Sequence, residues 1–136
     1  AYSVCAGMYG VLCISGDVSD LAKNKWEFAL RGVDFYKKAS PVIVNGLTER
    51  FGPFQVSNRE LKGYQAGVRY GQEGKALVIV HSFEHEGVQE IRIPLKGEYR
   101  IAGKYETGDH GIRTTGSELI MEFSEPFDAL AVLLER

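Results

Sequence analysis

The amino-acid sequence predicts a mainly β protein in which an antiparallel β-sandwich is preceded by one βα unit. Two features of the sequence predict this fold class. From Gly63 onward, short runs of β-branched, leucine and aromatic residues alternate with turn signals, at roughly eight to twelve residues per strand. Upstream of them, an apolar run at residues 11–14 ends at the turn Ser15-Gly16-Asp17 and is followed by a helical pattern.

The first part of the chain predicts the βα unit. Residues 11–14 are apolar without alternation, which is typical of a strand buried on both faces, as in parallel α/β sheets. Ser19 or Asp20 can cap a helix that begins near Leu21, because a short side-chain oxygen satisfies a free N–H there. A parallel strand needs neighbours joined through crossover helices, and only ten residues precede this one. We therefore expect the chain to be the tail of a larger α/β protein.

Helical spacing continues over residues 21–39, which predicts an amphipathic helix of about five turns. Phe28 and Phe35 lie off its main apolar stripe, so the helix is expected to bury two sides. Pro41 is expected to end the helix, because proline disfavours helical geometry at Ser40. The main stripe consists of Ala22, Trp26, Ala29, Leu30, Val33 and Tyr36.

The second half of the chain predicts six strands, at residues 64–70, 76–83, 88–95, 99–105, 118–123 and 127–134. Two of them alternate clearly, through Ile91, Ile93 and Leu95 and through Leu119, Met121 and Phe123. Alternation of this kind gives one dry and one wet face, as in an antiparallel sandwich or barrel. The predicted division is residues 1–46 for the strand, helix and exit, 47–62 for a connector, and 63–136 for the sandwich.

Composition excludes several classes of function. A hydrophobic content of 44% and a charged content of 25% are those of a soluble globular protein. The net charge of −2 gives no field that recruits nucleic acid or anionic lipid, and no apolar run approaches the ~20 residues of a membrane span. We therefore expect no nucleic-acid or membrane partner. Cys5 and Cys13 form neither a disulfide framework nor a metal spacing, so both are expected in the core, which favours a reducing compartment such as the cytoplasm.

Asp17 is the candidate substrate-binding residue. Side chains just past the carboxyl end of a strand in an α/β sheet face the ligand, and Asp17 follows the apolar run directly. The alternative is a turn or cap role, which aspartate also favours. For Asp20 the cap is the preferred interpretation.

Histidines and glutamates of the sandwich give no clear site. His81, His85 and His110 suggest a metal set at first sight, but no further ligand stands near them in a supporting pattern. Glu84, Glu86 and Glu90 crowd one turn, which is typical of an exposed acidic hairpin rather than of an acid/base pair. We therefore expect no metal, no cofactor and no catalytic residue in this chain.

Several phrases of the sequence carry a family resemblance. They are GVLCISGD at 10–17 with Leu21, DFY at 34–36 with PVI at 41–43 and Gly46, KALVIVH at 75–81, and EPFDAL at 125–130. In this order they resemble the C-terminal end of α-galactosidase (melibiase-type) glycoside hydrolases, whose catalytic (β/α)8 barrel is followed by an antiparallel β-sandwich. The resemblance implies that the βα unit is left over from that barrel, as its last strand and helix.

The resemblance also implies a function. The two catalytic aspartates of the family's retaining mechanism, which uses carboxyl groups ~5 Å apart, lie on earlier barrel strands that this chain lacks. Only Asp17 falls where a substrate contact is expected. The chain is thus predicted to be an inactive fragment whose sandwich supports the barrel. Its expected partners are the rest of that barrel and, through the barrel, a carbohydrate substrate. A second copy of the chain, bound through residues 1–16, is a further possible partner. The alternative is a stand-alone carbohydrate-binding or protein-interaction module.

An apolar stretch at residues 1–14 invites aggregation if it stays exposed. We expect it to fold against the sandwich or to pair with a second copy of the chain.

Overall fold

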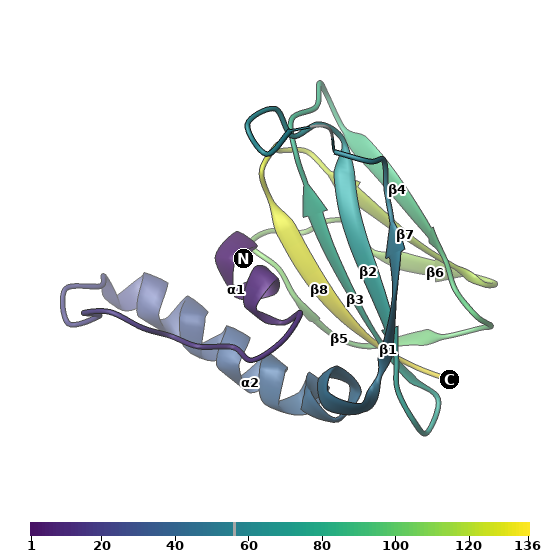
Figure 1. Ribbon diagram of the computed structural model, residues 1–136, viewed down its shortest axis with the longest axis horizontal. Coiled ribbons are helices and arrows are strands. Elements are labelled where there is room, and N and C mark those ends of the chain that lie inside the picture. Colours follow the sequence, from purple (N-terminus) through teal and green to yellow (C-terminus); the bar gives the residue numbers. More distant parts are fainter. Residues whose placement is uncertain (56) are drawn as a thin grey trace.

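The computed structural model describes residues 1–55 and 57–136 and contains two antiparallel sheets with two helices on one side (Figure 1). The helices are α1 (Tyr2–Gly7) and α2 (Lys23–Asn45). The strands are β1 (Leu47–Phe51), β2 (Tyr64–Tyr70), β3 (Lys75–Ser82), β4 (Gln89–Pro94), β5 (Arg100–Tyr105), β6 (Arg113–Thr115), β7 (Glu118–Phe123) and β8 (Ala129–Glu135). The five-stranded sheet has the order β1-β2-β3-β8-β5, and the three-stranded sheet has the order β4-β7-β6. The predicted fold class, a mainly β antiparallel sandwich, is confirmed.

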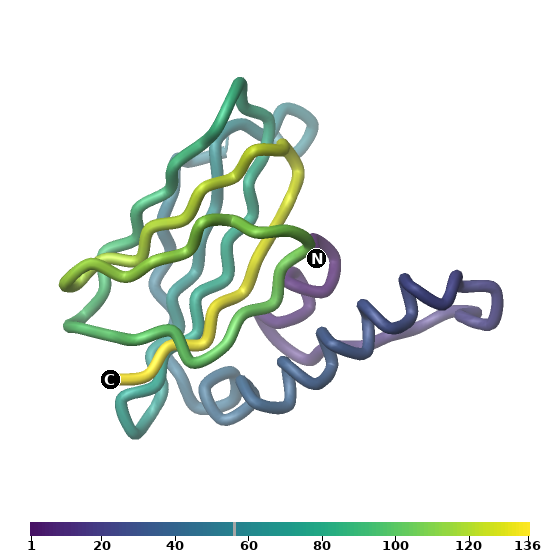
Figure 2. The backbone as a smooth tube through the Cα atoms, turned by 180° about the vertical axis from the view of Figure 1, so that it is seen from behind, coloured from purple at the N-terminus to yellow at the C-terminus, as the bar shows by residue number. Residues whose placement is uncertain are grey.

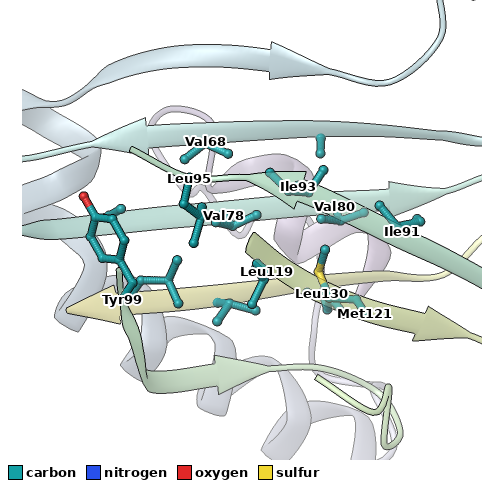
Figure 3. Packing of buried hydrophobic residues seen from close by; sticks show 14 of the residues in the cluster. Val68, Val78, Val80, Ile91, Ile93, Leu95, Tyr99, Leu119, Met121 and Leu130 are labelled. Atoms are coloured by element: carbon teal, nitrogen blue, oxygen red, sulfur yellow. The ribbon is translucent and has the colours of Figure 1, made fainter. Parts of the chain in front are cut away.

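The first core lies between the two sheets (Figure 3). The alternating residues predicted to face inward do so: Ile91 and Ile93 of β4 and Leu119 and Met121 of β7 are buried in it. They meet the inward residues of the larger sheet, such as Val78 of β3, which is paired with Val132 of β8. Period-two alternation therefore places these strands correctly, because only one face of the smaller sheet is covered.

The larger sheet is covered on both faces at its centre. In β3 and β8, residues 76–80 and 129–134 are all buried. Alternate residues enter the core between the sheets, whereas Leu77, Ile79 and Leu133 enter a second core on the outer face. Continuous apolar runs therefore mark strands buried on both faces, and here those strands are antiparallel.

Helices α1 and α2 form the cover of the outer face. Cys5 and Met8, in and just after α1, and Phe35, Ala39 and Val42 of α2 are buried against the sheet. The segment at residues 1–14 was expected to fold against the sandwich or to pair with a second copy. Its first nine residues fold against the sandwich. Burial raises the pKa of the Cys5 thiol to about 12, so this thiol stays protonated.

Arg69 of β2 ties the helical layer to the sheet. Its guanidinium donates hydrogen bonds to the Ile43 carbonyl oxygen at 2.6 Å, the Tyr9 carbonyl oxygen at 3.0 Å and the Thr48 Oγ1 at 2.7 Å. The Ile43 carbonyl lies in the last turn of α2, where the helix itself supplies no N–H partner. One side chain therefore satisfies the end of α2 and fixes both the segment after α1 and strand β1.

Residues 11–14 do not form the predicted strand, and this part of the expected βα unit is a correction. They lie in an extended loop between α1 and α2, and Val11 is 88% exposed. A strand needs hydrogen-bonded neighbours, and no strand of the described residues pairs with this segment. Cys13 is exposed in the same loop, so only one of the two cysteines is a core residue.

Helix α2 differs from the prediction at both ends. It begins at Lys23 after Ala22, with no side-chain cap, rather than at a cap formed by Ser19 or Asp20. It also continues through Pro41 to Asn45. Proline has no N–H for the Lys37 carbonyl, but the Ser40 hydroxyl donates a 2.8 Å hydrogen bond to that oxygen, and burial of the following turn offsets the remaining cost.

The connector and the N-terminal segment contain elements that the sequence did not predict. Strand β1 at residues 47–51 pairs with β2, so part of the expected connector belongs to the larger sheet. Helix α1 and the short strand β6 were also missed. The division of the chain at residues 46 and 62 into barrel remnant, connector and sandwich stays a prediction.

Only one side of α2 is covered. Its buried residues include Gly32, Phe35 and Ala39, on the side of Phe28 and Phe35 rather than on the predicted main stripe. Leu30 of that stripe is 41% exposed and Trp26 is only partly buried. The first half of α2 and the loop before it project from the sandwich as an arm, as Figures 1 and 2 show from opposite sides.

Gly32 allows α2 to lie close to α1 and β5. A Cβ atom at this position would lie 2.6 Å from Val4 Cγ1 and 2.9 Å from Tyr105 Cζ. Gly32→Ala gains about 1 kcal/mol of helix propensity but overpacks the site, which costs about 1–3 kcal/mol. We expect a net fall in the free energy of unfolding, measured by urea denaturation. Lys38→Ala, at an exposed position of the same helix, is the control and should be neutral; an equally stable or more stable Gly32→Ala variant would contradict this packing.

Candidate functional site

Asp17, the predicted substrate-binding residue, lies in the exposed loop that leads to α2. Its Oδ1 accepts hydrogen bonds from the Ser19 backbone N–H at 2.9 Å and from the Ser19 hydroxyl at 2.6 Å. These two bonds hold the pKa of Asp17 below its ordinary value. In the isolated chain Asp17 therefore makes an Asx turn, and Asp20 lies farther along the same loop without capping α2.

The loop and α2 enclose an apolar groove of about 270 Å³. Its walls include Leu12, Ile14 and Leu21 from the loop and Trp26 and Ala29 from the helix. Two residues of the predicted main stripe, Trp26 and Ala29, thus face this groove, whereas Tyr36 of the same stripe packs against the outer core of the sandwich. We call the exposed apolar residues of this arm the open strip; it consists of Val11, Ile14, Val18, Leu21 and Leu30.

The three histidines lie in separate places. His81 is buried beside Tyr2 and Tyr9, and its Nε2 lies 3.1 Å from the Tyr2 carbonyl oxygen; burial lowers its pKa. His85 lies between the carbonyl oxygens of Gly87 and Glu125, at 2.9 and 3.2 Å. Among residues 1–55 and 57–136, no group of three or more histidine, cysteine, aspartate or glutamate side chains is placed to hold a metal ion.

His110 lies at the centre of a buried charged cluster, which we call the His110 cluster. Its Nδ1 is 2.8 Å from a Glu106 carboxylate oxygen, and its Nε2 is 3.1 Å from Asp128 Oδ2. Carboxylate oxygens accept hydrogen bonds, so both ring nitrogens donate in the imidazolium form. The ring also packs on Phe123 at a centroid distance of 4.8 Å. The cluster joins the segment after β5 to the turn before β8.

The electrostatics of the His110 cluster favour its charged form. Desolvation by burial lowers the pKa of His110, but hydrogen bonds and charge from Asp128 and Glu106 outweigh it and raise the pKa above its ordinary value. For Asp128, desolvation raises the pKa, but bonds from His110, Ala129 N–H and Thr107 outweigh it and lower the pKa. Both directions agree, so each partner favours the charged form of the other.

The His110 cluster holds the fold and does not form a reaction centre. The His110 side chain is only 6% exposed. Glu106 also pairs with Lys104, and Asp128 also accepts hydrogen bonds from the Ala129 N–H and the Thr107 hydroxyl. Each carboxylate is therefore fully engaged with fixed partners. Sequence reasoning missed this cluster because Asp128 lies 18 residues after His110 and meets it only in the folded chain, although Glu106 is only four residues before His110.

The acidic hairpin was correctly predicted to be exposed at Glu84, Glu86 and Glu90. Glu90 forms ion pairs with Arg92 at 2.8 Å and Arg113 at 3.2 Å. The hydrogen bond from Arg92 is the main cause that lowers the pKa of Glu90. A carboxylate held in this way is a poor general acid.

A second concave surface lies in the loop between β1 and β2. This cavity of about 490 Å³ is lined by Pro53, Phe54, Gln55, Glu60, Lys62 and Gly63. Phe54 is 82% exposed. Sequence reasoning treated the segment as a packed connector; the only signal for a surface site was an aromatic residue next to the Gly52-Pro53 turn.

No described helix is long and apolar enough to cross a membrane.

Comparisons with known proteins give one structural likeness. No family model matches the sequence, and no curated protein matches it. The crystal structure of an α-amylase from H. orenii is similar, with a TM-score of 0.50 and 15% sequence identity over 81% of this chain. The match covers 20% of the α-amylase chain, so this chain spans about a fifth of its length. The fold of this chain thus resembles a part of that α-amylase structure.

The pKa directions in the His110 cluster predict how stability depends on pH. His110 has a raised pKa when folded, so its contribution is full below its unfolded value of 6.5 and is lost as the pH rises through the folded value. Asp128 has a lowered pKa, so its contribution is present above 3.8 and is lost as the pH falls through the folded value. The cluster therefore stabilises the fold most between about pH 4 and 6.5.

The test is the melting temperature from pH 5 to 9 for the protein and for His110→Gln. We expect His110→Gln to lower the free energy of unfolding by about 3 kcal/mol at pH 6 and to remove part of the fall in stability toward pH 9. Asp109→Asn, at a side chain that is 88% exposed, is the control. An unchanged pH profile in His110→Gln would show that the imidazole carries no such charge.

Proposed function

We propose that this chain is the non-catalytic C-terminal part of a larger retaining glycoside hydrolase of the α-galactosidase type. Its sandwich supports a catalytic (β/α)8 barrel, and α2 with the preceding loop is the part of the chain that contacts that barrel. The likeness to a fifth of an α-amylase chain supports a glycoside hydrolase segment. The phrases at residues 10–17, 75–81 and 125–130 support the α-galactosidase type.

The observation that carries the proposal is the open strip. Monomeric proteins rarely leave large apolar patches uncovered, yet Val11 and Leu30 of the open strip stay 88% and 41% exposed. The opposite side of α2, with Phe35, is fully packed on the sandwich. A helix that is apolar on two sides lies between two layers. The second layer is what the proposed barrel supplies.

Residues 11–14 gain a definite role in this arrangement. An apolar run without alternation is stable as a strand only where both edges and both faces are covered, and the described chain supplies neither. In the longer protein we expect the apolar side chains of this loop to pack against the barrel. Asp17, which follows the run directly, is then the residue of this chain that we propose binds substrate hydroxyl groups.

Two other partners account for the open strip less well. Pairing of a second copy through residues 1–16, as the sequence suggested, is restricted, since Cys5 and Met8 are already buried against the sandwich. A stand-alone module leaves it uncovered. The stand-alone reading has one specific observation in its favour, the cavity at Phe54, which is independent of the strip.

The test compares the isolated chain with the longer protein encoded by its full reading frame. Val11→Asp should leave the isolated chain within about 0.5 kcal/mol of its stability, because the site is exposed. It should destabilise the longer protein by several kcal/mol, because it buries an unpaired charge there. Val88→Asp, at another exposed valine, is the control in both.

Activity gives a second test. The proposal places both catalytic carboxylates outside this chain, so only the longer protein should hydrolyse p-nitrophenyl α-galactoside, and Asp17→Asn should raise its KM.

Three results would overturn the proposal. One is a reading frame without βα units before this chain, and another is hydrolysis by the isolated chain. A third is a dimer of the isolated chain that Val11→Asp dissociates while the longer protein is unaffected, which would assign the strip to a second copy.

A further inference from the structure

We propose that the loop between β1 and β2 binds a neutral carbohydrate in the cavity at Phe54. This inference goes beyond the proposed function and does not depend on it. In Figure 1 the loop lies at the top of the sandwich, away from the arm formed by α2. The cavity of about 490 Å³ falls within the range of about 300–1,000 Å³ that is usual for small-molecule sites.

The loop is held in shape at its two ends. The Gln55 side-chain amide bonds the Lys62 backbone twice, accepting from its N–H at 3.1 Å and donating to its carbonyl oxygen at 2.9 Å. Gly63 bonds the chain after β3 through Phe83 N–H at 2.7 Å and the Glu84 carbonyl oxygen at 3.2 Å. Gly52 has φ of 106°, and a Cβ there would lie 2.4 Å from the Tyr64 carbonyl oxygen. The bonds at Gln55, Lys62 and Gly63 reduce the entropy that these residues lose when a ligand binds.

Phe54 is the apolar wall of the cavity, and its exposed side chain adds little hydrophobic stabilisation to the fold. Its ring stays 82% exposed, although burying a phenylalanine is worth about 2 kcal/mol or more. The flat face of an aromatic ring offers a surface with negative partial charge, which attracts the slightly positive C–H groups on one face of a pyranose. This contact recognises a sugar ring without requiring a charge on it.

The polar wall of the cavity fits hydroxyl groups rather than an ion. Glu60 and Lys62 line it from the same loop, and no salt bridge joins either to a partner within the described residues. Their opposite charges balance within the lining itself, and the nearby Arg50 guanidinium is engaged with the Pro53 carbonyl oxygen at 3.4 Å. The Glu60 carboxylate accepts hydrogen bonds and the Lys62 ammonium donates them. This pair suits two neighbouring sugar hydroxyls, because each hydroxyl both donates and accepts. Aromatic and polar walls together therefore favour a neutral sugar over an apolar peptide.

The test is a titration of the isolated chain with melibiose, maltotriose and cellotriose, followed by backbone NMR shifts and calorimetry. We expect saturable, weak binding of at least one sugar, with the largest shifts at the lining residues 53–55, 60, 62 and 63. Phe54→Ala should weaken that binding by roughly tenfold or more, and Glu60→Gln should weaken it less. Phe127→Ala, which removes another exposed ring outside the cavity, should bind as the unchanged chain does.

Two outcomes would overturn the site. The first is the absence of saturable binding for all three sugars, and the second is binding that survives Phe54→Ala unchanged. Neither outcome tests the proposed contact with a barrel, because the titration uses the isolated chain. Conversely, sugar binding at Phe54 does not require that a barrel exists.

Discussion

The structure depends on the burial of β3 and β8 on both faces. Every residue from Ala76 to Val80 and from Ala129 to Leu134 is buried, and in a pleated strand successive side chains point to opposite sides. The larger sheet therefore cannot be exposed on either face at its centre. One face is covered by the smaller sheet, and the other requires a helical layer. The two cores follow directly from these two strands.

The helical layer is fixed by few but specific contacts. Arg69 bonds the end of α2, the segment after α1 and strand β1 with one guanidinium, and Gly32 lets α2 approach Tyr105. Together with the contact of Phe28 on Tyr105, these contacts hold α2 from about Phe28 onward. The first turn of α2 extends beyond them, and Trp26 meets the loop before the helix. The open strip is thus a consequence of a helix longer than the sheet that it covers.

The predictable parts of this fold were those encoded by local pattern. Alternation in Ile91, Ile93 and Leu95 reports one covered face, so β4 and β7 were predicted within a residue or two. Residues 11–14 and 77–80 are both apolar without alternation. This pattern alone does not distinguish a strand buried on both faces from an apolar loop. Whether partners for such a strand exist in the chain is not a local property. Pro41 did not end the helix for two reasons. The Ser40 hydroxyl donates to the Lys37 carbonyl oxygen, which proline cannot bond, and Val42 and Ile43 in the next turn are buried.

The candidate sites were less predictable than the fold. Asp17 was placed at a strand end, but without the strand it closes an Asx turn on Ser19, and its role toward substrate stays a prediction. The His110 cluster depends on Asp128, which only the tertiary structure brings to His110, whereas the cavity at Phe54 lies within the single loop between β1 and β2. His110 and Asp128 are 18 residues apart in the chain, and the shape of the loop that carries Phe54 is set by the Gln55 amide on Lys62. Neither arrangement leaves a spacing that sequence reasoning recognises.

The central claim is that the open strip is a surface that another part of a longer protein covers. Hydrogen exchange of the backbone amides at residues 11–22 measures this directly, because protection reports burial and hydrogen bonding residue by residue. The account predicts fast exchange in the isolated chain, and exchange slowed by orders of magnitude, to the level of β3 and β8, in the longer protein. Strong protection of these amides in the isolated chain, or equally fast exchange in the longer protein, would contradict it.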